Sequence, residues 1–466
     1  WLVLPYVLSP MPTWLAPYEG NGQTFEPATP PPERRSPRPD GLIALHLFVF
    51  LSQFKPSEPF LVDYLVEEKG LTNSIVAHDV FVLYVYGRLP ALIVVGLFSE
   101  LRCFGNRGTL IVGAAAGLAT EVLTRFGTSL WLLQAAQLTA AANMASRFAV
   151  FPMVFALSSP EQFQDCIHLV KASLLLSNAS SALLGEALRD HGGTPLSLLF
   201  SASVLGQLLT FLCALALPKA QEACSPTRSS NVRRGESLAI DLWYSLRLRR
   251  VAWWTAWALV MNAVHGLVLT YWQSLVRAKS IVADHNGYLL SSMYLAAAVL
   301  TAASRNLELL RGSSSLLVIV SLLFSGLVLV QTATAEGELP LYSWLLFYQC
   351  LFELLTAVCT LQVGAEIVWA VAEAAEGRRR APTRARLTLL FTCTGILTSA
   401  LEVVIQAAIR SLKQAQRFRY LGAGLAAFAL GLILVRGVEA ASRAHARRSA
   451  ASLSVALATP PAALAA

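Results

Sequence analysis

Apolar runs long enough to cross a lipid bilayer recur along the chain from Gly41 almost to Arg436. A transmembrane helix needs roughly 20 mainly apolar residues, because it must span a hydrocarbon core about 30 Å thick. Of the 466 residues, 55% are hydrophobic and 14% are charged, whereas a soluble domain carries about a quarter charged residues. The sequence therefore predicts an all-α, polytopic membrane protein.

The apolar runs predict about twelve transmembrane helices, divided six and six by a polar segment. The predicted spans are 41–65, 78–99, 109–126, 128–157, 162–188, 194–217, 251–276, 283–303, 313–332, 340–364, 386–409 and 418–436. A long middle loop between two six-helix halves is typical of the major-facilitator fold. We expect five regions: a disordered or irregular leader at 1–40, a six-helix bundle at 41–217, a cytoplasmic middle loop with an amphipathic lead-in at 218–250, a second bundle at 251–436, and a disordered cytoplasmic tail at 437–466.

Lysine and arginine concentrate in alternate loops between the predicted spans. The middle loop, the segment 375–386 and the tail after Arg436 hold most of the arginine. Because basic loops stay on the cytoplasmic side, we expect both termini to be cytoplasmic, with the plasma membrane as the location. The basic residues at 410–419, just before the last span, depart from this pattern.

Several ionisable residues fall inside the predicted spans. They include Glu58, Arg88, Arg147, Glu353 and Glu402. Each costs on the order of 2.5–3.5 kcal/mol at the centre of a span, so each needs a partner or water. Two interpretations remain open for each residue: an ion pair between helices, or a place in a wet central cavity. We favour the cavity for the group, because these charges cannot all face lipid.

Neutral polar and aromatic residues extend this list of candidate binding residues. Gln137 and Gln349 offer hydrogen-bonding groups within spans, and Tyr84 lies deep enough to stack on a flat ligand or to face a cation. Trp257 and Tyr271 both lie on the seventh span. Other tryptophans of that span are typical of the aromatic belt at the membrane surface.

The motifs of soluble enzymes and of metal or cofactor sites are missing from the sequence. There is no GxxxxGK[ST], HExxH or GxSxG motif. The arginines that make the net charge +8 fall in loops between spans, which does not indicate a nucleic-acid surface. We therefore expect a protein that is not an enzyme, with no cofactor, no metal and no nucleic-acid partner.

The first span ends in an unusual stretch, FKPSEPFLVDYL, at residues 54–65. Pro56 and Pro59 each remove a backbone hydrogen bond and push the preceding residue toward extended geometry. Broken helices at membrane depth are tolerated where they line a cavity. The stretch therefore predicts that Glu58 is held facing a central site, where its carboxylate can bind an organic cation.

Several motifs together resemble those of the reduced folate and thiamine carriers, a branch of the major-facilitator superfamily. They are KPSEPFL at 55–61, SSPEQFQ at 158–164, WTAW with YWQ at 254–257 and 271–273, HNGY at 285–288, and TLQVGAEI at 360–367. The resemblance runs from about residue 41 to 436, and PSEPF is its most specific part. It implies a carrier that moves thiamine or a folate by alternating access without ATP, coupled to a proton or an organic anion.

The resemblance also implies roles for individual residues. In the thiamine branch, Glu58 would face the cationic vitamin and Tyr84 would stack on it. Three positions depart from that branch, because Gln137 replaces a glutamate, Ala140 a tyrosine and Thr270 an asparagine.

The folate branch uses cations to bind the two carboxylates of its ligand. Arg147 matches one of them and Lys171 matches a basic residue found across the family. Gln349 replaces an arginine, however, and Glu402 replaces a lysine, which reverses the charge.

Charge decides our preferred substrate. Counting Glu58, Glu353 and Glu402 against Arg88 and Arg147, a cation is favoured over a dicarboxylate, because like charges in a dry site repel strongly. Thiamine or a related cationic heteroaromatic is therefore the expected substrate. A reduced folate or antifolate is the alternative, and a non-transporting membrane receptor or scaffold with the same fold is an alternative of another class.

Overall fold

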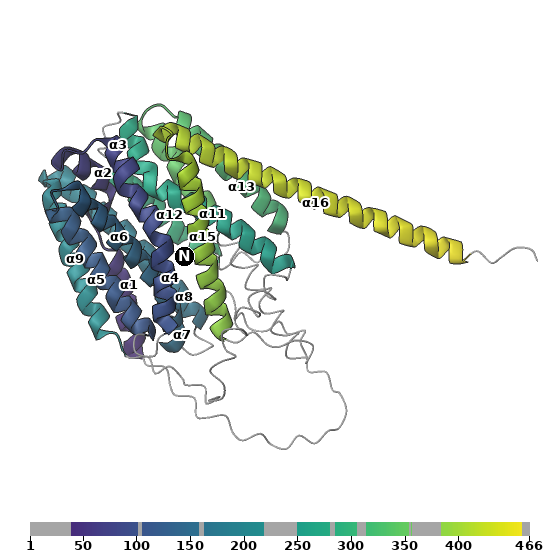
Figure 1. Ribbon diagram of the computed structural model, residues 1–466, viewed down its shortest axis with the longest axis horizontal. Coiled ribbons are helices and arrows are strands. Elements are labelled where there is room, and N and C mark those ends of the chain that lie inside the picture. The colour runs from purple at the N-terminus through teal and green to yellow at the C-terminus, as the bar shows by residue number, and fades with distance from the viewer. Residues whose placement is uncertain are drawn as a thin grey trace, which may run out of the picture.

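The computed structural model describes residues 39–100, 105–157, 163–218, 249–279, 285–304, 314–353, 356 and 384–458. All regular structure in these residues is helical (Figure 1). Residues 1–38 of the predicted leader and most of the middle loop lie outside the described residues, whereas residues 39 and 40 begin the first helix.

The N-terminal half contains six spans, three of which are interrupted. Their elements are α1 (Pro39–Gln53), η1 (Glu58–Phe60), α2 (Leu61–Asp63) and η2 (Tyr64–Glu68); α3 (Asn73–Ile75), η3 (Val76–Val80) and α4 (Phe81–Glu100); α5 (Gly105–Phe126); α6 (Leu130–Ser146), η4 (Arg147–Ala149) and α7 (Val150–Leu157); α8 (Phe163–Gly192); and α9 (Leu196–Ala216).

The C-terminal half follows the same plan. Its elements are α11 (Arg249–Ala278), α12 (Asn286–Ser304), α13 (Ser314–Thr334), a helix through 338–353, α15 (Arg384–Ile409) and α16 (Gln414–Ala458). Each predicted span thus has a helical counterpart, although the tenth is described in full only to residue 353. The all-α class predicted from the sequence is confirmed.

Four helical stretches in the described part of the chain are long and apolar enough to cross a membrane. They cover 73–96, 105–126, 196–216 and 414–435, and three shorter apolar helices cover 286–300, 319–334 and 394–409. Many leucines and valines on these helices are exposed, as expected for side chains that face lipid instead of water.

The two halves pack against each other mainly through two pairs of helices, and α11 and α12 of the second half also contact the interrupted spans of the first. α8 of the first half lies along α12 of the second, and α4 lies along α15 (Figure 1). The largest apolar core contains residues of both halves, including Val62 and Val80 with Leu267 and Val276. A smaller core belongs to the N-terminal half alone.

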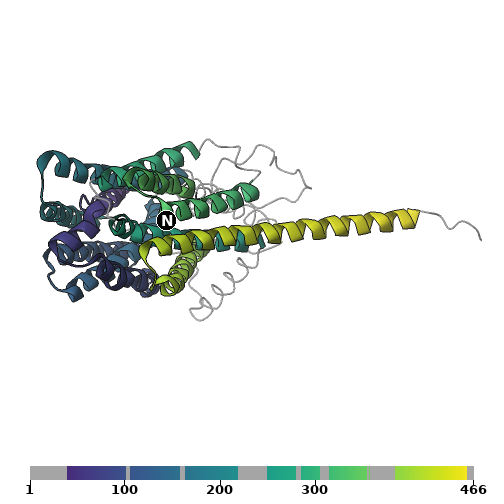
Figure 2. The same ribbon diagram turned by 90° about the horizontal axis from the view of Figure 1, so that it is seen from above.

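The last helix differs from the prediction. α16 continues to Ala458 and projects from the bundle as a long rod (Figures 1 and 2). Residues 437–458 were predicted to be disordered, and this is wrong for that stretch. It lacks proline and is rich in alanine and arginine, both strong helix formers, so the helix has no reason to end at the membrane.

Candidate substrate-binding site

The first span is broken at its prolines, as the sequence predicts. α1 ends at Gln53 and η1 begins at Glu58, which leaves four residues without regular structure. The backbone groups freed by this break are bound by side chains of α9. The amide of Ser57 donates to Oγ of Ser203 (3.2 Å), the two serine hydroxyls are 2.8 Å apart, and Nε2 of Gln207 donates to the carbonyl of Ser52 (3.3 Å).

Two glycines allow neighbouring helices to approach the break. A Cβ at Gly206 on α9 would lie 2.8 Å from the carbonyl oxygen of Phe54, and a Cβ at Gly185 on α8 would overlap the carbonyl oxygen of Pro56. Glycine is needed where another backbone comes this close. The break is therefore a packed and hydrogen-bonded feature of the fold.

The second half also binds the broken helix, through Gln273 of α11. Its Nε2 donates to the carbonyl of Glu58 (2.8 Å), and its Oε1 accepts from the amide of Val62 (3.1 Å). One amide side chain thus satisfies two backbone groups of the opposite half. This fixes the position of Glu58 relative to both halves.

Glu58 keeps 51% of its side-chain surface accessible, although its neighbour Ser57 is only 2% exposed. Its carboxylate lies close enough to Tyr84 of α4, Arg147 of η4 and Tyr294 of α12 for electrostatic interaction. Because these groups come from both halves, Glu58 lies near the boundary between them. That this carboxylate faces a central binding site stays a prediction.

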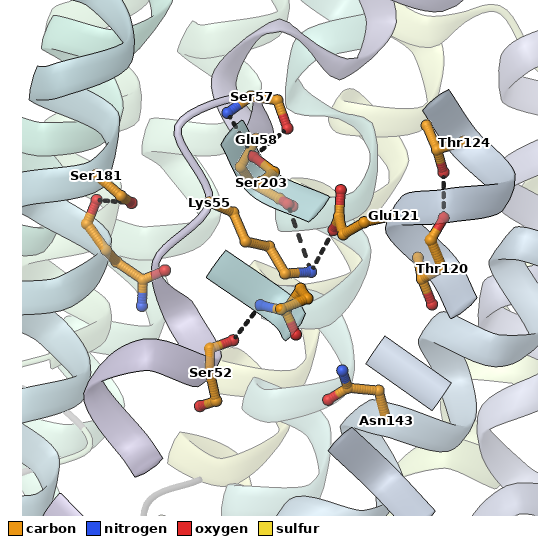
Figure 3. Close-up of polar contacts among 12 residues, drawn as sticks. Ser52, Lys55, Ser57, Glu58, Thr120, Glu121, Thr124, Asn143, Ser181 and Ser203 are labelled. Atoms are coloured by element: carbon orange, nitrogen blue, oxygen red, sulfur yellow. Dashed lines mark hydrogen bonds and ion pairs between the residues drawn. The ribbon is translucent and has the colours of Figure 1, made fainter. Parts of the chain in front are cut away.

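Beside Glu58 lies an ion pair that the sequence reasoning missed. Nζ of Lys55 is 3.0 Å from Oε1 of Glu121 on α5 and 4.0 Å from Oε2 of Glu58 (Figure 3). The side chain of Glu121 is only 6% exposed. A carboxylate inside the predicted span at 109–126 is the signal that could have identified it.

Arg88 and Glu402 form a second ion pair, which links the two halves. Nη1 of Arg88 on α4 lies 2.8 and 2.7 Å from the two carboxylate oxygens of Glu402 on α15. The guanidinium carbon lies 5.7 Å from the centre of the Tyr84 ring. Glu402 is 1% exposed, so its charge is neutralised by Arg88 and is not presented to a ligand.

Glu353 is paired in the same way. Nζ of Lys171 on α8 lies 3.1 Å from its Oε2, and Nε2 of Gln349 donates to its Oε1 (3.3 Å). Glu353 and Gln349 are 5% and 2% exposed. The expectation that Glu353 and Glu402 present free negative charge to a substrate is therefore wrong, because each is buried beside a cation.

The remaining predicted residues divide between the site and the core. Arg147 lies near Glu58, and its Nε donates to Oδ1 of Asn143 (3.2 Å), while Gln137 is buried on α6. Trp257 and Tyr271 are 2% and 0% exposed within the large apolar core. Their predicted contact with substrate is not supported, because their rings pack against protein.

One end of the bundle is closed by contacts between the halves. Nη1 of Arg277 on α11 lies 3.0 Å from Asp63 and 2.6 Å from Glu67. At the same end, the amide of Gly287 on α12 donates to the carboxylate of Glu186 on α8. A solute at Glu58 would therefore not leave through this end without separation of these contacts.

Comparison with known proteins gives the same family on two grounds. The profile described as "Reduced folate carrier" matches residues 41–234. The chain is 23% identical over 402 residues to a folate-like transporter of Dictyostelium discoideum, covering 84% of this chain and 65% of that protein. It is 25% identical to thiamine transporter 2 of Mus musculus, over 38% of this chain and 36% of that protein. It is 28% identical to the reduced folate transporter of Homo sapiens, over 40% of this chain and 31% of that protein.

The chain thus spans less than two thirds of the length of these relatives. Among solved structures, it resembles a POT family transporter in complex with 5-aminolevulinic acid, with a TM-score of 0.60 and 13% identity over 85% of this chain and 96% of that one. A second POT family structure, in complex with a thioalcohol-conjugated peptide, has a TM-score of 0.56 and 14% sequence identity, and the match covers 86% of this chain and 97% of that one. These likenesses confirm the predicted major-facilitator fold.

Proposed function

We propose that the chain is a carrier of the reduced folate and thiamine type, which transports a water-soluble vitamin across a membrane by alternating access; the profile match over residues 41–234 and the folate-like relative support this proposal. The observation that carries this proposal is the position of Glu58. It is a half-accessible carboxylate on a broken first helix, surrounded by polar groups from both halves. Binding between two bundles that rock about a central site is the general mechanism of such carriers.

We propose thiamine or a related cationic heteroaromatic as the substrate. Three buried carboxylates, Glu121, Glu353 and Glu402, each lie within 3.1 Å of a lysine or arginine nitrogen. Glu58 lies 4.0 Å from Nζ of Lys55, and its exposed surface leaves it open to a ligand. The ring of Tyr84, already near Arg88, supplies an aromatic face beside it.

The contacts at the closed end suggest the direction in which the site opens. If both termini are cytoplasmic, the end that carries Asp63, Arg277 and Gly287 is the outer one. The arrangement then corresponds to an outer gate that is shut, with release toward the cytoplasm. We propose the plasma membrane as the location and a proton or an organic anion as the counter-substrate.

A reduced folate or antifolate is the second candidate, and Arg147 favours it. This residue places a guanidinium near Glu58, where it could bind a carboxylate of the ligand. Lys171 does not add to that charge, because it is paired with Glu353. A ligand with two carboxylates would meet Arg147 but also the negative charge of Glu58, which costs binding energy.

Uptake measurements in cells that lack their own vitamin carriers test the proposal. We expect uptake of radiolabelled thiamine above that of vector-transfected cells, and competition by unlabelled thiamine but not by methotrexate. Uptake of methotrexate without thiamine would establish the folate alternative. Thermal stabilisation of the purified protein by thiamine without any uptake would contradict transport and support a receptor.

A further inference from the structure

The lysine beside Glu58 could in principle occupy the place of a cationic substrate. Lys55 lies three residues before Glu58, in the irregular segment between α1 and η1. Its ammonium group is 4.0 Å from the carboxylate of Glu58, and its flexible four-carbon stem allows a closer approach. A lysine bound to Glu58 would cancel the charge that attracts the substrate.

The structure places this ammonium group elsewhere. Lys55 Nζ is 3.0 Å from Glu121, at ion-pair distance, so it binds Glu121 in preference to Glu58 (Figure 3). Glu121 is 6% exposed and Glu58 is 51% exposed. A buried carboxylate needs a counter-ion more than an exposed one, because water screens the exposed charge.

Among the residues that the structure describes, Lys55 is the cation found in ion-pair contact with Glu121. The neighbouring hydroxyl groups on α5 donate to backbone carbonyls and not to Glu121. Thr120 Oγ1 donates to the carbonyl of Ala116, and Thr124 Oγ1 donates to the carbonyl of Thr120. Lys55 is the cation that the described contacts give to Glu121. The two carboxylates and one ammonium group thus form a set in which Glu121 takes the lysine and Glu58 stays available.

We propose that Glu121 is a positioning residue that determines charge specificity: by holding Lys55, it leaves Glu58 free to bind a cationic substrate. The inference rests on the proposed function, since it assigns a second residue to the same site. Without the charge of Glu121, Lys55 would turn to Glu58. The region around Glu58 would then contain Lys55 and Arg147 against a single carboxylate.

A double-mutant cycle tests this. Glu121→Gln should raise the KM for thiamine uptake at least about tenfold, while the maximum rate per transporter at the cell surface changes little. Adding Lys55→Met to Glu121→Gln should restore most of the affinity, because the competing ammonium group is then gone. A purely structural role of Glu121 would instead lower surface abundance or maximum rate, and removal of Lys55 would not restore KM.

The outcomes separate the two proposals. If the unmodified protein shows neither uptake nor binding of thiamine, the proposed function fails. If it transports thiamine but Glu121→Gln leaves KM unchanged, or the double variant stays as weak as the single one, the role of Glu121 is contradicted while the function stands. Thermal unfolding of each purified variant identifies any variant that does not fold. If Glu121→Gln does not fold, Glu121→Asp replaces it as the test. The shorter carboxylate of Glu121→Asp should hold Lys55 less closely and raise the KM by a smaller factor, and an unchanged KM would contradict the role of Glu121.

Discussion

Replacing Glu58 with Gln should lower thiamine uptake at low substrate concentration by at least about tenfold. The variant keeps the size and polarity of the side chain but removes the charge. A hydrogen bond to a charged group contributes about 1.5–3 kcal/mol, and a loss of about 1.4 kcal/mol weakens binding tenfold. The carbonyl of Glu58, which accepts from Gln273, is untouched by this change, so the broken helix should keep its position.

The matched control for this prediction is Glu336→Gln. Glu336 is an exposed acid in the loop after α13, and the loss of its charge should leave uptake unchanged. Surface biotinylation should show similar amounts of both variants and of the unmodified protein. Equal thiamine uptake by Glu58→Gln and Glu336→Gln would contradict a binding role for Glu58.

Removing the charge of Arg88 should destabilise the folded protein strongly. Arg88→Met leaves Glu402, which is 1% exposed, without its cation. Breaking a buried ion pair from one side costs about 3–5 kcal/mol, because the remaining charge is neither solvated nor paired. We expect a clear fall in the thermal unfolding temperature of the purified protein and in its abundance at the membrane.

Substitution of both residues tests whether Arg88 and Glu402 act as a pair or independently. In the double variant Arg88→Met with Glu402→Met, both charges are gone, and stability should return toward that of the unmodified protein. Exchange of the two charges, Arg88→Glu with Glu402→Arg, should recover part of it. If the destabilisations of the two single variants simply add in the double variant, Arg88 and Glu402 do not form the ion pair that joins α4 to α15.

Local features of the fold could be predicted from the sequence better than partners distant along the chain. Pro56 and Pro59 predict the broken helix, because each lacks the backbone N–H that would donate a helical hydrogen bond. The side chains that bind this break, including Ser203 and Gln273, lie 146 residues or more away. No local rule identifies them, because only the packing of whole helices brings them together.

The candidate site shows the same division. A charge inside an apolar run indicates that a partner or water must be near, and Arg88, Glu353 and Glu402 were all identified in this way. Arg88 and Glu402 are 314 residues apart in the sequence, and their contact forms only when the helices pack. The sequence therefore could not decide between an ion pair and a charge exposed to a water-filled cavity. Trp257 and Tyr271 lie in the apolar core, and a binding role for them stays a prediction, because an aromatic side chain in a span is equally suited to packing and to binding.

Labelling of a cysteine introduced at position 58 tests the central claim most directly. In the variant Glu58→Cys, a polar methanethiosulfonate reagent that cannot dissolve in lipid should modify the new thiol, and mass spectrometry of its peptide separates it from the native cysteines. Modification of the thiol at position 58 is the predicted result. A thiol at position 58 that stays unmodified in the intact membrane would contradict a carboxylate that faces water between the two halves.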